Sequence, residues 1–249
     1  MLLSGIRLGY TEFYVFTDDH RMTCSVLDFD TILLDMDGTL LDLYFDDQFW
    51  NKRVPDAVAS QRDMTIDEAR NLVFSALESA QGTLLWYDFE HWSEQFNLNL
   101  DALQRTQSKL IRPRVGTENF LKWLCKQDKQ VILATNAHPK VLTFKLSVVE
   151  QQLPAFEHYF SKIVSSSDLG HPKEAADFWH ALCHQLQIGP QRAILVDDNP
   201  HVLAAARRYG IGGQIAINQP NSHLAPQIVP NFDNVCFLDE LITESIHDH

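Results

Sequence analysis

The chain has 249 residues, of which 45% are hydrophobic and 21% are charged, a balance that is ordinary for a soluble globular protein. Its formal net charge is −13, from 20 basic and 33 acidic side chains, so it lacks an overall field that would hold nucleic acid or an anionic membrane surface. No apolar stretch approaches the ~20 residues that a membrane-spanning helix needs. The length allows one large domain, or a core domain that carries a smaller one.

The N-terminal segment and the cysteines add little chemistry. Residues 1–21 show no clear periodicity and lack the order of a secretion signal, so we treat them as an N-terminal appendage. A protein that starts at Met22 should be as active and as stable as the full chain. The four cysteines form no CxxC pair and lie among apolar residues. We therefore expect buried, reduced thiols in a cytoplasmic protein.

Short β-rich runs recur along the chain, and most of them alternate with helical segments. The runs are residues 31–35, 130–135, 161–165, 193–197 and 214–218. Continuous apolar character over about four residues is typical of strands that are covered on both faces. The alternation predicts the α/β class, with a Rossmann-like parallel sheet as the core and helices on both of its faces.

One long segment interrupts this alternation. Across residues 44–112 no run is typical of a buried strand, and apolar residues recur at helical spacing instead. One of the expected helices begins with a capping box formed by Thr65 and Glu68. We therefore expect residues 44–112 to form a helical cap domain, inserted into an α/β core that consists of residues 22–43 and 113–249.

Polar side chains follow the carboxyl ends of four expected strands, and such ends converge on one crevice in an open parallel sheet. In chain order they are Asp35 and Asp37, Thr135 and Asn136, Lys173, and Asp197 and Asp198. So many carboxylates suit a hard divalent cation with oxygen ligands, Mg²⁺ first, which would neutralise their mutual repulsion. A phosphoryl group could dock against Mg²⁺, Lys173 and the Thr135 hydroxyl.

This arrangement supports a particular chemistry. A carboxylate in contact with the phosphoryl group could attack phosphorus and form an aspartyl-phosphate. A second carboxylate two residues further on could protonate the leaving oxygen and later deprotonate water. The spacing of Asp35 and Asp37 fits that pair of roles, and Gly38 allows the chain to turn back tightly beside them.

The four motifs "DMDGTL", "LATN", the loop lysine and "VDDN" resemble those of the haloacid dehalogenase superfamily of phosphatases. The pattern covers residues 31 to about 218, and the insertion after the first motif corresponds to the helical cap of that superfamily. The stretches "LLDMDGTLLDLYFDDQFW", "WYDFEHWSEQF" and "LATNAHPKVLTFKL" are similar to the bacterial GMP/IMP nucleotidase branch.

The resemblance implies roles for the aspartates. Asp35 would be the nucleophile and Asp37 the general acid and base. Mg²⁺ would be held by Asp35, by the main-chain carbonyl of Asp37 and by the fourth-motif aspartates. Asp198 takes the position that most often ligates the metal. Asp197 stands where glycine is usual, so the division of labour between these two aspartates stays open.

The resemblance also implies that Thr135, Asn136 and Lys173 hold the phosphoryl oxygens. The implied activity is that of a Mg²⁺-dependent phosphomonoesterase which converts purine nucleoside 5′-monophosphates, GMP or IMP, to nucleoside and phosphate. The implied partner is a small phosphorylated molecule, and we expect a monomer or a weak homodimer without nucleic-acid or membrane partners.

Three alternatives remain. The first is a phosphatase of another small metabolite, such as a sugar phosphate or phosphoglycolate. The second is a metal-independent haloacid dehalogenase, against which Asp37 and the acidic fourth motif argue. The third is a non-catalytic interaction protein, which should have lost at least one of the motif residues, yet all are present.

The expected cap is rich in aromatic residues. They could form the core of the cap, or one or two of them could stack on a nucleotide base. They are Phe45, Phe49, Trp50, Trp86, Tyr87, Phe89 and Trp92.

Overall fold

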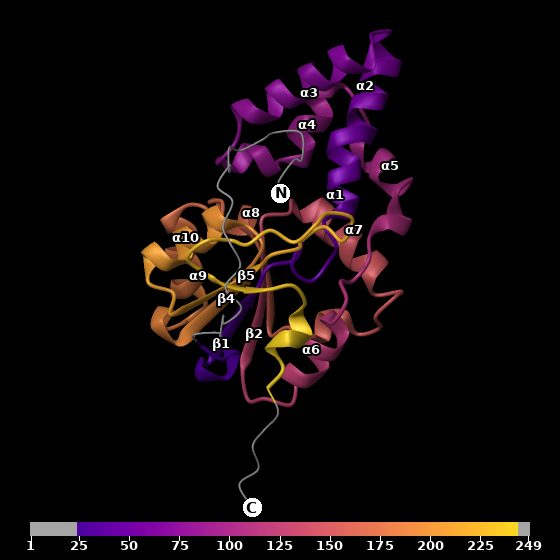
Figure 1. Ribbon diagram of the computed structural model, residues 1–249. Coiled ribbons are helices and arrows are strands. Elements are labelled where there is room, and N and C mark those ends of the chain that lie inside the picture. The colour runs from indigo at the N-terminus through magenta and orange to yellow at the C-terminus, as the bar shows by residue number, and fades with distance from the viewer. Residues whose placement is uncertain (1–23, 244–249) are drawn as a thin grey trace, which may run out of the picture.

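A computed structural model describes residues 24–243 of the chain (Figure 1). Its core is a six-stranded, wholly parallel sheet in the order β3-β2-β1-β4-β5-β6. The strands are β1 (Thr31–Leu34), β2 (Gln130–Thr135), β3 (Lys162–Ser165), β4 (Ala193–Asp197), β5 (Gly213–Ile217) and β6 (Asp233–Val235). The five expected strands and the α/β class are confirmed. The expected N-terminal appendage, residues 1–21, lies outside the described residues.

Two hydrophobic cores flank the sheet, because successive side chains of a strand point to opposite faces. On the central strand β1, Ile32 and Leu34 belong to one core and Leu33 belongs to the other. Helices α6 (Thr117–Leu124) and α7 (Pro139–Val149) contribute to the first core. Helices α9 (Ala176–Leu186) and α10 (Pro200–Tyr209) contribute to the second, and the short α8 (Ser166–Leu169) precedes α9.

The segment after β1 folds as a group of helices with a hydrophobic cluster of its own. In Figure 1 this group stands at one end of the sheet, above the helices that flank it. The capping box expected at Thr65 and Glu68 is present. The elements are α1 (Tyr44–Gln48), the π-helical turn η2 (Phe49–Arg53), α2 (Val54–Arg62), α3 (Ile66–Ser79), η3 (Leu84–Tyr87), α4 (Phe89–Phe96), α5 (Leu100–Arg105) and η4 (Ser108–Leu110).

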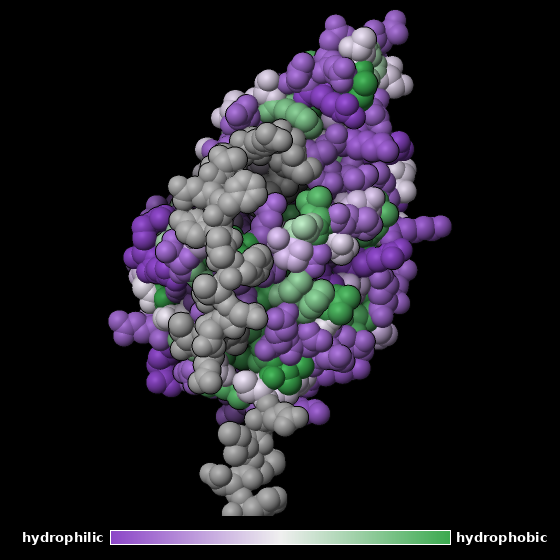
Figure 2. Space-filling model, in the orientation of Figure 1, coloured by the Kyte–Doolittle hydropathy of each residue, from purple (hydrophilic) through white to green (hydrophobic). Residues whose placement is uncertain are grey.

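The surface in Figure 2 is mostly polar, over the cap helices as well as over the core. Within residues 24–243 no helix has the length and apolar character that a bilayer crossing requires. Within residues 24–243 the four cysteines form no disulfide, only Cys183 is buried, and Cys125 is exposed. The expectation that all four are buried was therefore wrong. Cys24, Cys125 and Cys236 lie just outside the helices and strands, where apolar neighbours in sequence do not determine burial.

Candidate active site

The carboxyl ends of the central strands bring the expected site residues together. β1 lies between β2 and β4, and its last residue, Leu34, is in register with Leu133 and Val196. The main-chain N–H of Asp35 continues this ladder by donating to the carbonyl of Val196 at 3.0 Å. Asp35 therefore stands beside Asp197, which ends β4, and the crevice lies where parallel sheets bind ligands.

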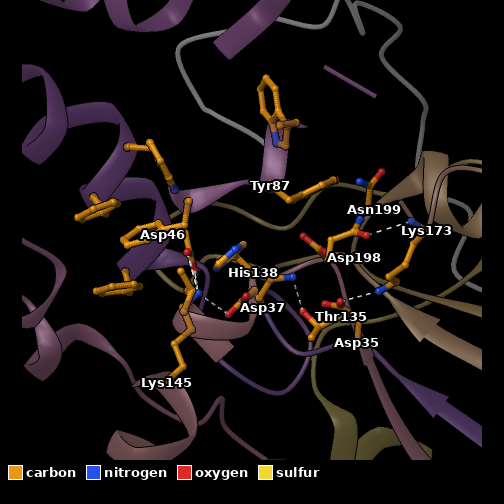
Figure 3. Close-up of a pocket in the computed structure, with 18 of the residues that line it drawn as sticks. Asp35, Asp37, Asp46, Tyr87, Thr135, His138, Lys145, Lys173, Asp198 and Asn199 are labelled. Atoms are coloured by element: carbon orange, nitrogen blue, oxygen red, sulfur yellow. Dashed lines mark hydrogen bonds and ion pairs between the residues drawn. The ribbon is translucent and has the colours of Figure 1, made fainter. Parts of the chain in front are cut away.

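A buried lysine joins two of the aspartates. The Nζ atom of Lys173 lies 2.6 Å from Oδ1 of Asp35 and 2.7 Å from Oδ2 of Asp197, and only 1% of the lysine side chain is exposed (Figure 3). Although burial opposes the charged ammonium, the carboxylates of Asp197 and Asp35 raise the pKa of Lys173. The lysine is therefore a permanent positive charge beside Asp35.

The same crevice fits a divalent metal ion. One carboxylate oxygen from each of Asp35, Asp197 and Asp198 lies within 4.8 Å of the others. Oδ2 of Asp198 is buried and has no hydrogen-bond partner among residues 24–243. Three carboxylates against the one ammonium of Lys173 leave a charge of −2, which an oxygen-preferring dication would balance.

The pKa values of these carboxylates are also consistent with a bound cation. Burial raises the pKa of Asp35 well above its ordinary value, against the opposing effect of Lys173. Burial, together with the neighbouring charge of Asp197, raises the pKa of Asp198 to about 7. A nearby cation favours the ionised form of a carboxyl group, so bound Mg²⁺ would counter both shifts. Asp35 and Asp198 with Asp197 are the residues that would hold it.

Asn136, the residue after β2, fixes the loop that carries Lys173. Oδ1 of Asn136 accepts from the main-chain N–H of Lys173 at 3.0 Å, and Nδ2 of Asn136 donates to Oε2 of Glu174 at 3.1 Å. Oγ1 of Thr135 accepts from the N–H of Ala137 at 3.0 Å. Thr135 keeps its hydroxyl proton as a donor toward the crevice, whereas both ends of the Asn136 amide are engaged.

Comparisons with known proteins agree with this geometry. A sequence model of the haloacid dehalogenase-like hydrolases matches residues 29–210. The chain belongs to this family. It is 36% identical over 198 residues to GMP/IMP nucleotidase YrfG of Escherichia coli (strain K12). The aligned region covers 80% of this chain and 87% of the relative. The protein of the same name from Shigella flexneri matches equally well.

Solved structures show the same fold. The crystal structure of a HAD phosphatase from Thermococcus onnurineus superposes with a TM-score of 0.70 at 21% identity, over 85% of this chain and 95% of that one. CbbY of Rhodobacter sphaeroides, solved in complex with phosphate, superposes with a TM-score of 0.51 at 15% identity, over 86% of this chain and 96% of that one.

In this haloacid dehalogenase-like hydrolase, Gly38 allows the main chain to lie close to Asp198, where a side chain at position 38 would clash. Its φ is +89°, and a Cβ atom at Gly38 would lie 2.5 Å from Oδ2 of Asp198. We expect Gly38→Ala to lower the free energy of unfolding by more than the ~1–2 kcal/mol that a left-handed backbone alone costs a residue with a Cβ atom. Urea denaturation measures the change.

Gly170 supplies the matched control for that prediction. Its φ is +74°, and no atom of the described residues lies within 4 Å of the Cβ that Gly170→Ala would add. This variant therefore reports the cost of the left-handed backbone without the clash. Equal destabilisation by the two substitutions would show that the Asp198 side chain moves aside without cost, and would contradict a tight contact between Gly38 and Asp198.

Three polar residues of the site were not expected from the sequence. Glu174 follows Lys173 and accepts from Oη of Tyr87, a cap residue, at 2.6 Å. Asp46 and Lys145 form a second charged group beside Asp37. Glu174 adjoins a motif residue, and Asp46 and Lys145 lie within two of the stretches that are similar to the GMP/IMP nucleotidase branch, but no pattern assigned a role to any of the three. Nothing in the local pattern distinguished Lys145 from other helix lysines.

Most of the cap aromatics face the site. The crevice is lined from the cap by Phe45, Phe49, Trp50, Trp86, Tyr87 and Phe89. Trp92 instead packs inside the cap, where its Nε1 donates to the carbonyl of Trp86 at 3.1 Å. The expectation of a cap core is confirmed for the buried residues Phe49, Trp50, Trp86, Phe89 and Trp92, which belong to the hydrophobic cluster of the cap. Stacking of an aromatic residue on a base stays a prediction.

The cap is closed over the crevice. Tyr87 of η3 is hydrogen-bonded to Glu174 of the core, and Lys140 of α7 pairs with Glu90 of α4. The cavity in the crevice is partly open to the surface and has a volume of about 80 Å³. That is room for a few waters or a phosphoryl group, but it falls short of the ~300–1,000 Å³ of ordinary ligand sites. A larger substrate would enter only when the cap moves away.

Proposed function

We propose that this hydrolase is a Mg²⁺-dependent phosphomonoesterase that acts on purine nucleoside 5′-monophosphates, with IMP and GMP preferred. The observation that carries the proposal is the buried Asp35 carboxylate beside Lys173, at the centre of a three-carboxylate cluster under an aromatic cap. The similarity to a relative named GMP/IMP nucleotidase supports the choice of substrate.

In the proposed reaction Asp35 is the nucleophile. Its carboxylate oxygen attacks phosphorus, and the P–O bond to the ribose oxygen breaks as Asp37 gives that oxygen a proton. Water then attacks the aspartyl-phosphate, its proton passes to Asp37, and the Asp35–phosphorus bond breaks. Bound Mg²⁺ would offset the negative charge of the phosphoryl group, which otherwise repels Asp35.

Lys173 and Thr135 would hold the phosphoryl oxygens during both steps. The lysine lies within hydrogen-bond distance of the nucleophile, so it would contact both the attacking and the transferred oxygens. Asn136 would act on the phosphoryl group mainly by fixing the main chain of Lys173, since its own amide is engaged within the protein.

The cap would select the leaving group. The core grips only the phosphoryl, whereas the aromatic lining offers flat apolar faces to a base, and base–aromatic stacking contributes ~1–3 kcal/mol. Purines present a larger face than pyrimidines. The preference for a 6-oxo purine follows from the named relative alone.

A substrate panel tests the proposal. We expect kcat/KM for IMP and GMP to exceed the values for AMP, CMP, ribose 5-phosphate and phosphoglycolate at one Mg²⁺ concentration. The small volume of the cavity makes a phosphatase of small acid or sugar phosphates the second candidate. If ribose 5-phosphate or phosphoglycolate exceeds IMP and GMP by tenfold or more, the second candidate replaces the first.

A further inference from the structure

The site contains a second buried lysine, which none of the motifs includes. Lys145 lies in α7, and 1% of its side chain is exposed. Its Nζ is 2.7 Å from Oδ1 of Asp37 and 2.7 Å from each carboxylate oxygen of Asp46 (Figure 3). Burying an ammonium group is unfavourable unless it is paired and hydrogen-bonded. Here three charge-assisted hydrogen bonds to carboxylate oxygens stabilise the buried ammonium.

Each of the two buried lysines contacts one of the two catalytic aspartates. Lys173 contacts Asp35, and Lys145 contacts Asp37. Asp37 is the more exposed of the two aspartates, with 19% of its side chain accessible, so packing alone does not fix its carboxylate. A short hydrogen bond from a buried and immobile donor does fix it.

Asp46 anchors the lysine from the other side. It belongs to α1, the first cap helix, whereas Lys145 belongs to a core helix. The ring of Phe45, also in α1, lies 5.1 Å from the lysine nitrogen, which adds a cation–π contact. The ammonium is therefore held between core and cap. Both of its carboxylate partners line the crevice, and Asp37 is the more exposed of the two, with 19% of its side chain accessible against 8% for Asp46.

We propose that Lys145 is a positioning residue that holds the carboxyl group of Asp37 toward the leaving oxygen and the attacking water, with Asp46 as its anchor. The proposal rests on the proposed phosphomonoesterase function. Lys145 binds Oδ1 of Asp37, so Oδ2 is the oxygen that gives the proton in the first step and takes it in the second.

The two half-reactions allow this role to be separated from a general loss of structure. An alkyl leaving group needs the proton of Asp37, whereas p-nitrophenolate departs without one. Hydrolysis of the aspartyl-phosphate needs Asp37 as a base with either substrate. Removal of the lysine should therefore slow both steps with a nucleotide, but only the second step with p-nitrophenyl phosphate, so that phosphoenzyme accumulates.

The test is Lys145→Met, assayed by steady-state and rapid-quench kinetics beside the wild type. We expect kcat for the best alkyl phosphomonoester of the panel to fall at least tenfold, which is part of the ~10²–10⁴-fold contribution of general acid–base catalysis. With p-nitrophenyl phosphate we expect a burst of nitrophenol that approaches the enzyme concentration, followed by slow turnover.

Three further variants complete the design. Lys122→Met removes an exposed lysine whose ion-pair partner in the described part of the chain is Glu118, also on α6, so it should change neither rate nor burst. Lys145→Met/Asp46→Asn leaves no unpaired carboxylate at the anchor position, and it carries the same expectation if the single variant does not fold. Asp37→Asn shows whether Asp37 acts in the reaction at all.

The outcomes distinguish the proposed phosphomonoesterase function from the positioning role of Lys145. If the wild type hydrolyses no phosphomonoester, or if Asp37→Asn is fully active, the proposed function fails. If Asp37→Asn is impaired but a folded Lys145 variant stays within twofold of the wild type, only the positioning role fails. An equal loss on both substrates without a burst also overturns that role, because it would reflect structural damage alone.

Discussion

Asp35→Asn is expected to abolish phosphate release while the protein stays folded. The amide keeps the shape of the side chain but has no carboxylate to attack phosphorus, and it removes one charge from the metal cluster. Lys173 keeps its ion pair with Asp197, so the buried lysine is not left without a partner. Steady-state assays of phosphate release, with a thermal melt to verify folding, measure the effect.

The control for this experiment is Asp177→Asn, which changes an exposed aspartate in the first turn of α9. It should leave the rate unchanged. If Asp35→Asn keeps more than a few per cent of wild-type turnover in preparations free of host phosphatases, covalent catalysis by Asp35 is wrong.

Exhaustive chelation with EDTA is expected to stop the reaction, and added Mg²⁺ should restore it. The three clustered carboxylates carry more negative charge than Lys173 neutralises, and the phosphoryl group would add to the excess. A second readout is independent of activity. Because a ligand that binds only the folded state stabilises it, Mg²⁺ should raise the melting temperature of the wild type.

Asp198→Asn should weaken that thermal shift, since Oδ2 of Asp198 is buried without a hydrogen-bond partner in the described part of the chain. Full activity after chelation, with residual metal excluded by elemental analysis, would contradict a role for the ion. An equal thermal shift in Asp198→Asn and the wild type would remove Asp198 from the site.

The strands and the motif residues could be predicted because their signals are local. A buried strand reads as an apolar run, and the residues at its carboxyl end follow directly in sequence, so Asp35 and Asp197 were located together with β1 and β4. The strand β6 was missed, because three residues, Asp233–Val235, are too few for a periodic signal.

The second charged group of the site could not be predicted for a different reason. Lys145 lies 108 residues from Asp37 in sequence and meets it only because α7 packs beside the start of the cap. A lysine in an amphipathic helix is normally solvated, so its burial becomes visible only in the folded chain. Similarly, the bond from Tyr87 to Glu174 exists only because the cap closes on the core.

The most direct test of the account is to identify the covalent intermediate. Enzyme mixed with radiolabelled IMP in the presence of Mg²⁺ would be acid-quenched during turnover, digested and analysed by mass spectrometry. The account predicts a labelled phosphoryl group on the peptide that contains Asp35. Its label is lost when excess unlabelled substrate is added before the quench, and the group is absent in Asp35→Asn. Continued turnover without a trapped phosphoryl group, or with one on another residue, would contradict it.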